Sequence, residues 1–127
     1  MAFILALRFL TRIPVSMRDE SARGAGDNAV LGRAMAWFPL VGLIIGAALA
    51  GVRWAMALAF GPLLASALTL AAWVAVTGGL HLDGAVDCFD ALALAAPAER
   101  RLAVLKDVHV GAYGVVGAAL LLLIKWL

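Results

Sequence analysis

The sequence predicts an all-α protein, a polytopic bundle of membrane helices. Hydrophobic residues make up 65% of the chain, charged residues only 14%, and the mean hydropathy is +1.04. A soluble globular domain is closer to half apolar and a quarter charged. The charges also fall into two blocks, residues 8–33 and 81–107, and the residues between these blocks carry only Arg53. Long uncharged stretches between short charged segments are typical of membrane spans joined by polar loops.

The first half of the chain is expected to hold a surface helix, a loop and a span. The apolar segment Ala2–Ile13 predicts an interfacial helix that Pro14 ends. The polar stretch Ser16–Asn28 is expected to form a flexible cytoplasmic loop. The first span runs from about Ala34 to Val52, with Arg53 at the far interface.

Two further spans are expected, which makes about three in all. Residues 56–62 are predicted to form a turn, and the second span runs from about Leu63 to Val76 or Leu80, where Gly78-Gly79 ends or distorts it. The third span begins near Gly114 and extends to Leu127. Both are short for a full crossing, which needs ~20 residues. We therefore interpret residues 1–127 as one membrane-embedded helical domain that forms the amino-terminal half of a longer protein.

The basic residues predict the orientation of these spans. Residues 8–33 contain five arginines, and the second block contains Arg100, Arg101 and Lys106. Because basic loops stay in the cytoplasm, we expect both blocks to face the cytoplasm in a multi-pass membrane protein. The lipid bilayer is then an expected partner, and the sequence is compatible with a homo-oligomer. We expect no binding to nucleic acid, because the chain has no basic stripe interleaved with aromatic residues.

An acidic motif follows the second span directly. Asp83, Asp87 and Asp90 stand at i, i+4 and i+7, so on a helix they share one face within ~60°. Carboxylates that share a face repel one another unless they are solvated or hold a cation, and Mg²⁺ prefers carboxylates together with phosphate oxygens and water. A solvated acidic face is the alternative, but ionisable residues beside a membrane span are usually functional. We interpret the motif as a magnesium site.

A second polar cluster precedes the third span. Lys106, Asp107 and His109 lie within four residues of one another, and Gly111 and Gly114 would let the backbone approach a ligand closely. Snorkelling or capping is the alternative for the lysine and the histidine. Since Pro97 breaks the chain between helices 84–95 and 98–107, the two helices are expected to fold back as a hairpin at the cytoplasmic face. This hairpin would bring both clusters to one pocket.

The motifs resemble those of the adenosylcobinamide-GDP ribazoletransferase (cobalamin 5'-phosphate synthase) family. The matching segments are GGLHLDGAVDCFDAL, KDVHVGAYGVVG, FLTRIPV at residues 9–15 and WFPLVGLIIG at residues 37–46. The resemblance implies a magnesium-dependent inner-membrane enzyme. Such an enzyme transfers cobinamide phosphate from adenosylcobinamide-GDP to α-ribazole or its 5'-phosphate and releases GMP.

The resemblance also assigns roles residue by residue. His81, Asp83, Asp87 and Asp90 correspond to the family's histidine and acidic motif, and Lys106, Asp107, His109 and Gly111 correspond to its second polar motif. We expect Asp83 and Asp87 to hold Mg²⁺, and Asp90 to complete the metal site or to act as the base. His81 and His109 are the other candidates for proton transfer, since histidine exchanges protons near neutral pH. Lys106 would neutralise phosphate charge, and Asp107 and Gly111 are expected to contribute to cofactor binding.

Other functions are weighed against this one. A CDP-alcohol phosphotransferase would show a D-x-x-D-G-x-x-A-R pattern, and a prenyltransferase would carry a second acidic triad, whereas this chain offers only Asp107. A cation transporter subunit would place its carboxylates near the bilayer midplane in repeated halves. A purely structural membrane subunit leaves both polar clusters without a role.

Overall fold

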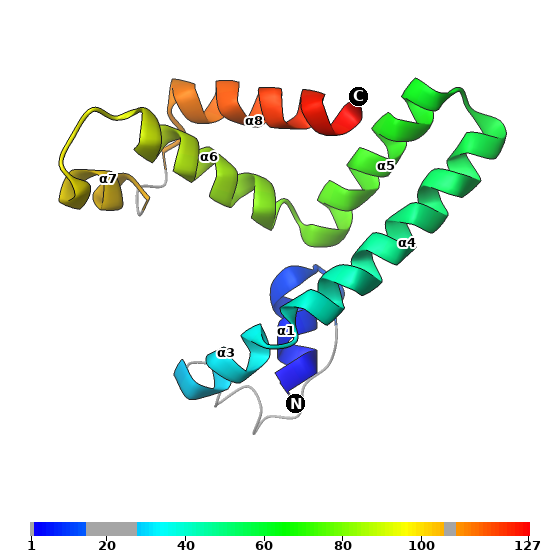
Figure 1. Ribbon diagram of the computed structural model, residues 1–127, viewed down its shortest axis with the longest axis horizontal. Helices are drawn as coiled ribbons and strands as arrows, with labels where there is room; N and C mark the ends of the chain where they lie inside the picture. The colour runs from blue at the N-terminus through cyan, green and yellow to red at the C-terminus, as the bar shows by residue number, and fades with distance from the viewer. Residues whose placement is uncertain (1, 15–27, 106–108) are drawn as a thin grey trace. The chain divides into compact units, whose positions relative to one another are not determined.

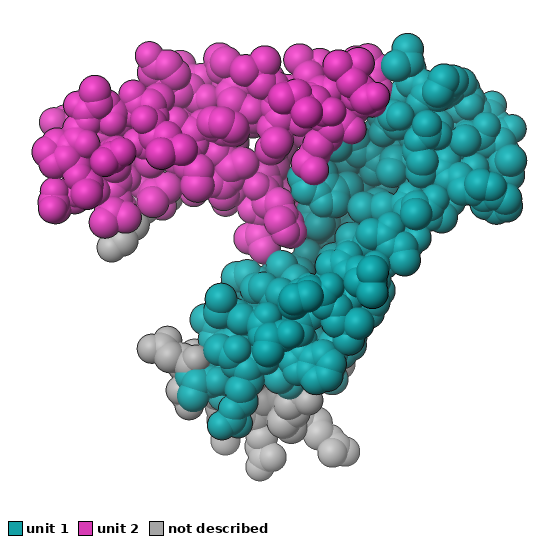
Figure 2. Space-filling model, in the orientation of Figure 1, with its two compact units in different colours: residues 1–78 teal, residues 79–127 magenta. Residues whose placement is uncertain are grey.

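The protein is described here by a computed structural model that covers residues 2–14, 28–105 and 109–127 (Figure 1). Within these ranges the chain forms seven helices and no strand, which confirms the all-α prediction. The chain divides into two compact units, Met1–Gly78 and Gly79–Leu127 (Figure 2). The predicted loop Ser16–Asn28 lies outside the described residues apart from Asn28. The single membrane-embedded domain over residues 1–127 stays a prediction.

The first unit begins with a small apolar core made by three helices. These are α1 (Ala2–Leu10), α3 (Asn28–Met35) and α4 (Phe38–Ala59). The buried side chains Ala6, Leu10, Ala34 and Val41 form the core. Edge-to-face contact between Phe3 and Trp37, with ring centroids 5.7 Å apart, and stacking of Phe9 on Phe38 at 5.5 Å extend it. These contacts hold the first helix against the start of the long one.

Two helix ends differ from the prediction for local reasons. The first helix ends at Leu10 rather than Ile13, because the backbone N–H of Arg12 bonds to the carbonyl of Val76 at 2.8 Å instead of continuing the helix. The first span does not begin at Ala34, because α3 ends at Met35 and α4 starts at Phe38. Proline in the first turn of α4 fits this restart, since it has no N–H to donate to a preceding turn.

The helical hairpin formed by α4 and α5 (Pro62–Thr77) completes the first unit. Helix α4 has 22 residues and continues through Arg53 to Ala59, so the predicted end at Val52 is wrong. A charged residue marks an interface but does not stop a helix. The connection is also shorter than the predicted turn over residues 56–62, because Phe60 and Gly61 alone separate the helices.

The second unit contains α6 (Leu80–Ala93), α7 (Ala98–Val104) and α8 (Ala112–Trp126). Helices α6 and α8 pack along each other, and α7 contacts α6 (Figure 1). Pro97 lies between α6 and α7, which confirms the predicted break, and it occupies the N-cap of α7. The predicted bounds 84–95 of the first of these helices are wrong, because α6 begins at Leu80, directly after the two glycines, and ends at Ala93. The third predicted span therefore corresponds to α8, which begins two residues before Gly114.

The surface of several helices is strongly apolar. By length and composition, α4 is the one described helix able to cross a membrane by itself, while α5 and α6 pass the same test only when taken together. Leu43, Trp54 and Leu58 on α4 and Ile124 on α8 are 69–73% exposed. The hydroxyls of Thr69 and Thr77 donate within α5 to the carbonyls of Ala65 and Trp73. Apolar exposure with internally satisfied polar groups suits contact with lipid or with further helices.

Candidate active site

Two consecutive glycines end α5 and start α6, the helix that carries the three aspartates. Gly78, the C-cap of α5, has φ 64°, and Gly79, the N-cap of α6, has φ 76°. Both lie in the left-handed region that only glycine adopts at little cost. The N–H of Asp83 then bonds to the carbonyl of Gly79 at 2.8 Å and closes the first turn of α6. A carboxylate in a first helical turn is stabilised by the helix dipole, so the break also favours Asp83.

The three acids have different surroundings although they share one helix. Asp83 and His81 are exposed, whereas Asp87 and Asp90 are half-buried. At ~100° per residue, Asp90 lies ~40° from Val86 and ~60° from Asp87 around the helix axis. Val86 faces α8, since a Cβ built at Gly114 would lie 2.8 Å from its Cγ1. Asp90 therefore stands at the border between the acidic face and the face that contacts α8.

Asp90 bonds to the start of α8 through both carboxylate oxygens. The N–H of Gly111 donates to Oδ2 and the N–H of Gly114 donates to Oδ1, each at 2.7 Å. Gly111 is the N-cap of α8 and Gly114 is three residues later, so Asp90 satisfies two N–H groups that have no partner within the helix. A side chain from another helix thus accepts the hydrogen bonds that the side chain of an N-cap residue normally accepts.

Three glycines on α8 make this contact sterically feasible. Gly111, Gly114 and Gly117 recur every three residues and face α6. A Cβ at Gly111 or Gly114 would collide with the carboxylate of Asp90, and a Cβ at Gly117 would collide with the ring of Phe89. The sequence prediction assigned Gly111 to close approach of a ligand, but in the structure the group that approaches is Asp90.

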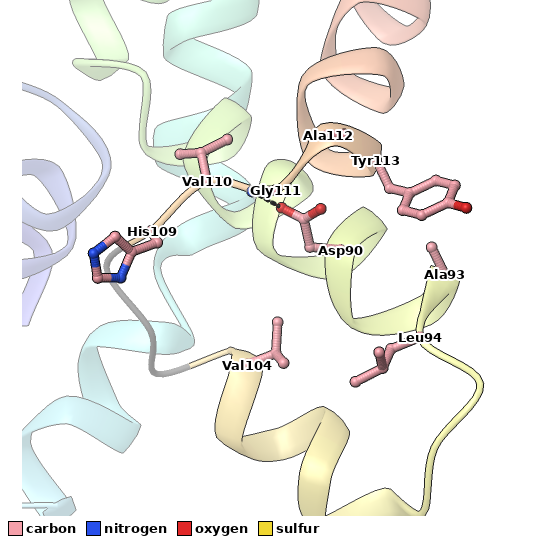
Figure 3. A pocket seen from close by; sticks show the side chains of 9 residues that line it. All are labelled: Asp90, Ala93, Leu94, Val104, His109, Val110, Gly111, Ala112 and Tyr113. Atoms are coloured by element: carbon pink, nitrogen blue, oxygen red, sulfur yellow. Dashed lines mark hydrogen bonds between the residues drawn. The ribbon is translucent and has the colours of Figure 1, made fainter.

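A cavity of about 440 Å³ lies beside this contact (Figure 3). It is lined by Asp90, Ala93, Leu94, Val104, His109, Val110, Gly111, Ala112 and Tyr113. Most of these side chains are apolar, and the polar groups are the carboxylate, the imidazole and the phenol. The cavity is therefore shaped by the C-terminal part of α6, the end of α7 and the start of α8.

The predicted site residues are brought together in part. Asp90, His109 and Gly111 border one cavity, whereas the described lining does not include His81, Asp83 or Asp87. Lys106 and Asp107 lie outside the described residues, so the prediction that they share a pocket with the acids stays a prediction. Sequence reasoning named Gly111 and Gly114 for close approach, but it missed Val86, Phe89, Tyr113 and Gly117. The three-residue spacing of the glycines was the available signal for the helix contact.

The donor set near the acidic face can be compared with what magnesium needs. Among the residues that the structure describes, no three Asp, Glu, His or Cys side chains gather closely enough to enclose a metal ion. Asp83 and Asp87, one helical turn apart, fit the other usual arrangement, in which one or two carboxylates hold Mg²⁺ together with water and substrate phosphates. The residues therefore fit magnesium that arrives with a phosphorylated substrate.

Comparison with known proteins matches nearly the whole chain. The family profile described as cobalamin-5-phosphate synthase matches residues 2–127. A protein named adenosylcobinamide-GDP ribazoletransferase from Novosphingobium aromaticivorans is 52% identical over 97% of this chain and 49% of its own length. Proteins of the same name from Brevibacillus brevis and Geotalea daltonii are each 47% identical over 98% of this chain and 48% of their own length.

The chain spans about half the length of these curated relatives. No solved structure matches it significantly. The matched region includes the Gly78-Gly79 break, the acids of α6 and the glycines of α8, which are the features that build the site. The chain belongs to the cobalamin-5-phosphate synthase family.

Proposed function

We propose that this chain supplies part of the active site of an adenosylcobinamide-GDP ribazoletransferase. One observation carries the proposal: identities of 47% and 52% to proteins of that name, over 98% and 97% of the chain. The activity would transfer the cobinamide phosphate moiety from adenosylcobinamide-GDP to α-ribazole or its 5'-phosphate, with release of GMP, late in cobalamin biosynthesis. The same family membership argues against the phosphotransferase, prenyltransferase and transporter alternatives.

The chemistry requires a base and charge neutralisation. A hydroxyl oxygen of the ribazole forms a bond to the phosphorus that bears cobinamide, the bond from that phosphorus to the oxygen of GMP breaks, and the hydroxyl proton passes to a base. His109 beside the cavity and His81 at the start of α6 are the candidate bases. Lys106 keeps its predicted role of neutralising phosphate charge, and Asp107 keeps its predicted role in cofactor binding.

Asp83 and Asp87 would hold a magnesium ion. Their spacing of one turn directs two carboxylates from the same helix face, and Asp83 is exposed while Asp87 is half-buried. When bound, Mg²⁺ would neutralise charge on the diphosphate and stabilise the leaving GMP. The two aspartates would orient the diphosphate against α6, so the reacting phosphorus is held at a fixed place relative to the bases.

The proposed location is the cell inner membrane, with the acidic helix on the cytoplasmic side. The length and apolar surface of α4 support a membrane location. Basic residues support a cytoplasmic position for both ends of the α4–α5 hairpin. They are Arg8 on α1, Arg12 just after it, Arg33 on α3, and Arg100 and Arg101 on α7. Water-soluble nucleotide substrates would then reach the site directly.

The test is a comparison of acidic variants in the purified protein. Asp83→Asn and Asp87→Asn should each lower GMP release from adenosylcobinamide-GDP by about 10²-fold or more, the loss typical of removing one electrostatic contact to a transition state. Each should also raise the Mg²⁺ concentration needed for half-maximal rate. Glu99→Gln is the matched control, because Glu99 is an exposed acid on α7. Wild-type rates across a magnesium titration in both aspartate variants would refute the metal assignment.

A further inference from the structure

The bonds of Asp90 distinguish it from the other two acids of α6. Both of its oxygens accept N–H groups from the first turn of α8, from residues 21 and 24 positions later in the chain. Hydrogen bonds of this length to a carboxylate are charge-assisted and strong. The partial positive charge of the helix N-terminus, roughly half an elementary charge, offsets part of the charge of the carboxylate and so stabilises it in this place.

We propose that Asp90 is a positioning residue, neither a magnesium ligand nor the base, and that it fixes residues 109–111 and the start of α8 against α6. The catalytic importance of this positioning role rests on the proposed function, whereas the hydrogen bonds of Asp90 to Gly111 and Gly114 do not depend on it. Among the described residues that line the cavity, five of nine, residues 109–113, belong to the segment that these bonds hold (Figure 3). Asp90 thereby sets where His109 and Tyr113 stand relative to α6.

The glycines support a carboxylate that stays in place. At Gly111 the three atoms nearest to an added Cβ all belong to Asp90, and at Gly114 the three nearest belong to Asp90 and Val86. If the carboxylate turned away to bind a metal, the two N–H groups would be left without a partner in a half-buried site, which is unfavourable. The packing and the hydrogen bonds therefore favour the same single position of Asp90.

A substitution that leaves every carboxylate intact separates the two roles. Gly111→Ala places a methyl group where the Asp90 carboxylate lies, and the φ of −85° at this residue accepts alanine. A positioning role predicts that Gly111→Ala reproduces the effect of Asp90→Asn. A metal-ligand role predicts that it does not. Gly84→Ala is the matched control, because a Cβ at Gly84 meets nothing within 4 Å.

The first measurement is amide hydrogen exchange in the purified protein reconstituted into nanodiscs, which requires no activity. In Asp90→Ala and Gly111→Ala, the amides of residues 111–115 should exchange about tenfold faster or more, as expected on losing bonds to a charged acceptor. In Asp83→Asn and Gly84→Ala they should keep wild-type protection. Asp90→Asn, which retains one acceptor oxygen, is the alternative if Asp90→Ala does not fold. Wild-type protection of these amides in both Gly111→Ala and Asp90→Asn would overturn the proposal.

The second measurement is the rate of GMP release per folded molecule. Asp90→Asn and Gly111→Ala should lower kcat by about 10²-fold, because misplacement of a catalytic group by ~1 Å has an effect of this size. The half-saturating Mg²⁺ concentration should not change, in contrast to Asp83→Asn. An unchanged kcat, or a magnesium shift equal to that of Asp83→Asn, would overturn the positioning role. If the full-length wild-type enzyme releases no GMP from adenosylcobinamide-GDP, the proposed function fails, whereas the exchange comparison still tests the bonds of Asp90 independently.

Discussion

Replacing Gly117 by alanine should weaken the contact between α6 and α8. A Cβ at this position would lie 2.7 Å from Cδ1 of Phe89 and nearer still to Cγ and Cδ2 of the same ring. These atoms include the root of the ring, so the whole phenyl group must move. Gly84 is the reference position, because it lies within α6 and a Cβ there meets nothing within 4 Å.

The expected size follows from two opposing effects. Glycine to alanine in a helix interior stabilises by about 1 kcal/mol through helix propensity. Overpacking a fitted contact destabilises by about 1–3 kcal/mol. Gly84→Ala should show only the gain in helix propensity, whereas Gly117→Ala should show both the gain and the overpacking. The unfolding free energy of Gly117→Ala should therefore be lower than that of Gly84→Ala by about 1–3 kcal/mol.

The assay is thermal or SDS-induced unfolding of the purified protein in micelles. Adding Phe89→Ala to Gly117→Ala should remove the collision, so the double variant should be more stable than the sum of the single effects by about 0.5–3 kcal/mol. If Gly117→Ala stabilises the protein as much as Gly84→Ala does, α8 does not pack on Phe89 as described. Additivity of the two substitutions would lead to the same conclusion.

Two further predictions concern the membrane orientation and the break before α6. In a background with Cys88→Ser, a cysteine at Ala59 should react with an impermeant reagent added outside intact cells and one at Ala98 should not, and the reverse pattern would overturn the proposed orientation. Gly78→Ala and Gly79→Ala should each lower the unfolding free energy by about 1–2 kcal/mol, since both residues have positive φ. The loss should be larger at Gly78, where a Cβ would also collide with the side chain of Arg12, and equal losses in the unfolding assay would count against that contact.

Helix boundaries were predictable where the backbone conformation that a residue type favours ends or starts the helix. Gly78-Gly79 ends α5 because both residues adopt a left-handed conformation, and Pro97 starts α7 because proline fits a helix start. The end of the first span was misplaced because Arg53 was taken as its limit, although α4 continues to Ala59. An isolated arginine changes where a helix prefers to sit in a membrane and leaves its backbone bonds unaffected.

The shared acidic face of α6 was predictable from the sequence, but which of its three aspartates contacts α8 was not. Helical periodicity places Asp83, Asp87 and Asp90 on one side of α6 without any knowledge of the partner helix. Which acid meets α8 depends on the register of two helices whose contacts lie more than twenty residues apart in the chain. The sequence did carry a signal for that register, since three glycines at intervals of three residues define a face that another helix can approach closely.

The position of Asp90 on the helix explains why one motif can serve two purposes. Moving around α6 from the face that contacts α8, Val86 comes first, then Asp90, then Asp83 and Asp87 within the next ~60°. A carboxylate at the border can bond to the backbone of α8 while its neighbours remain beyond the contact, exposed or half-buried. Moving this acid by one residue in either direction would rotate it by ~100°, into the contact or away from it. The i, i+4, i+7 spacing is thus the pattern expected when two acids serve a ligand and the third holds the helix that borders it.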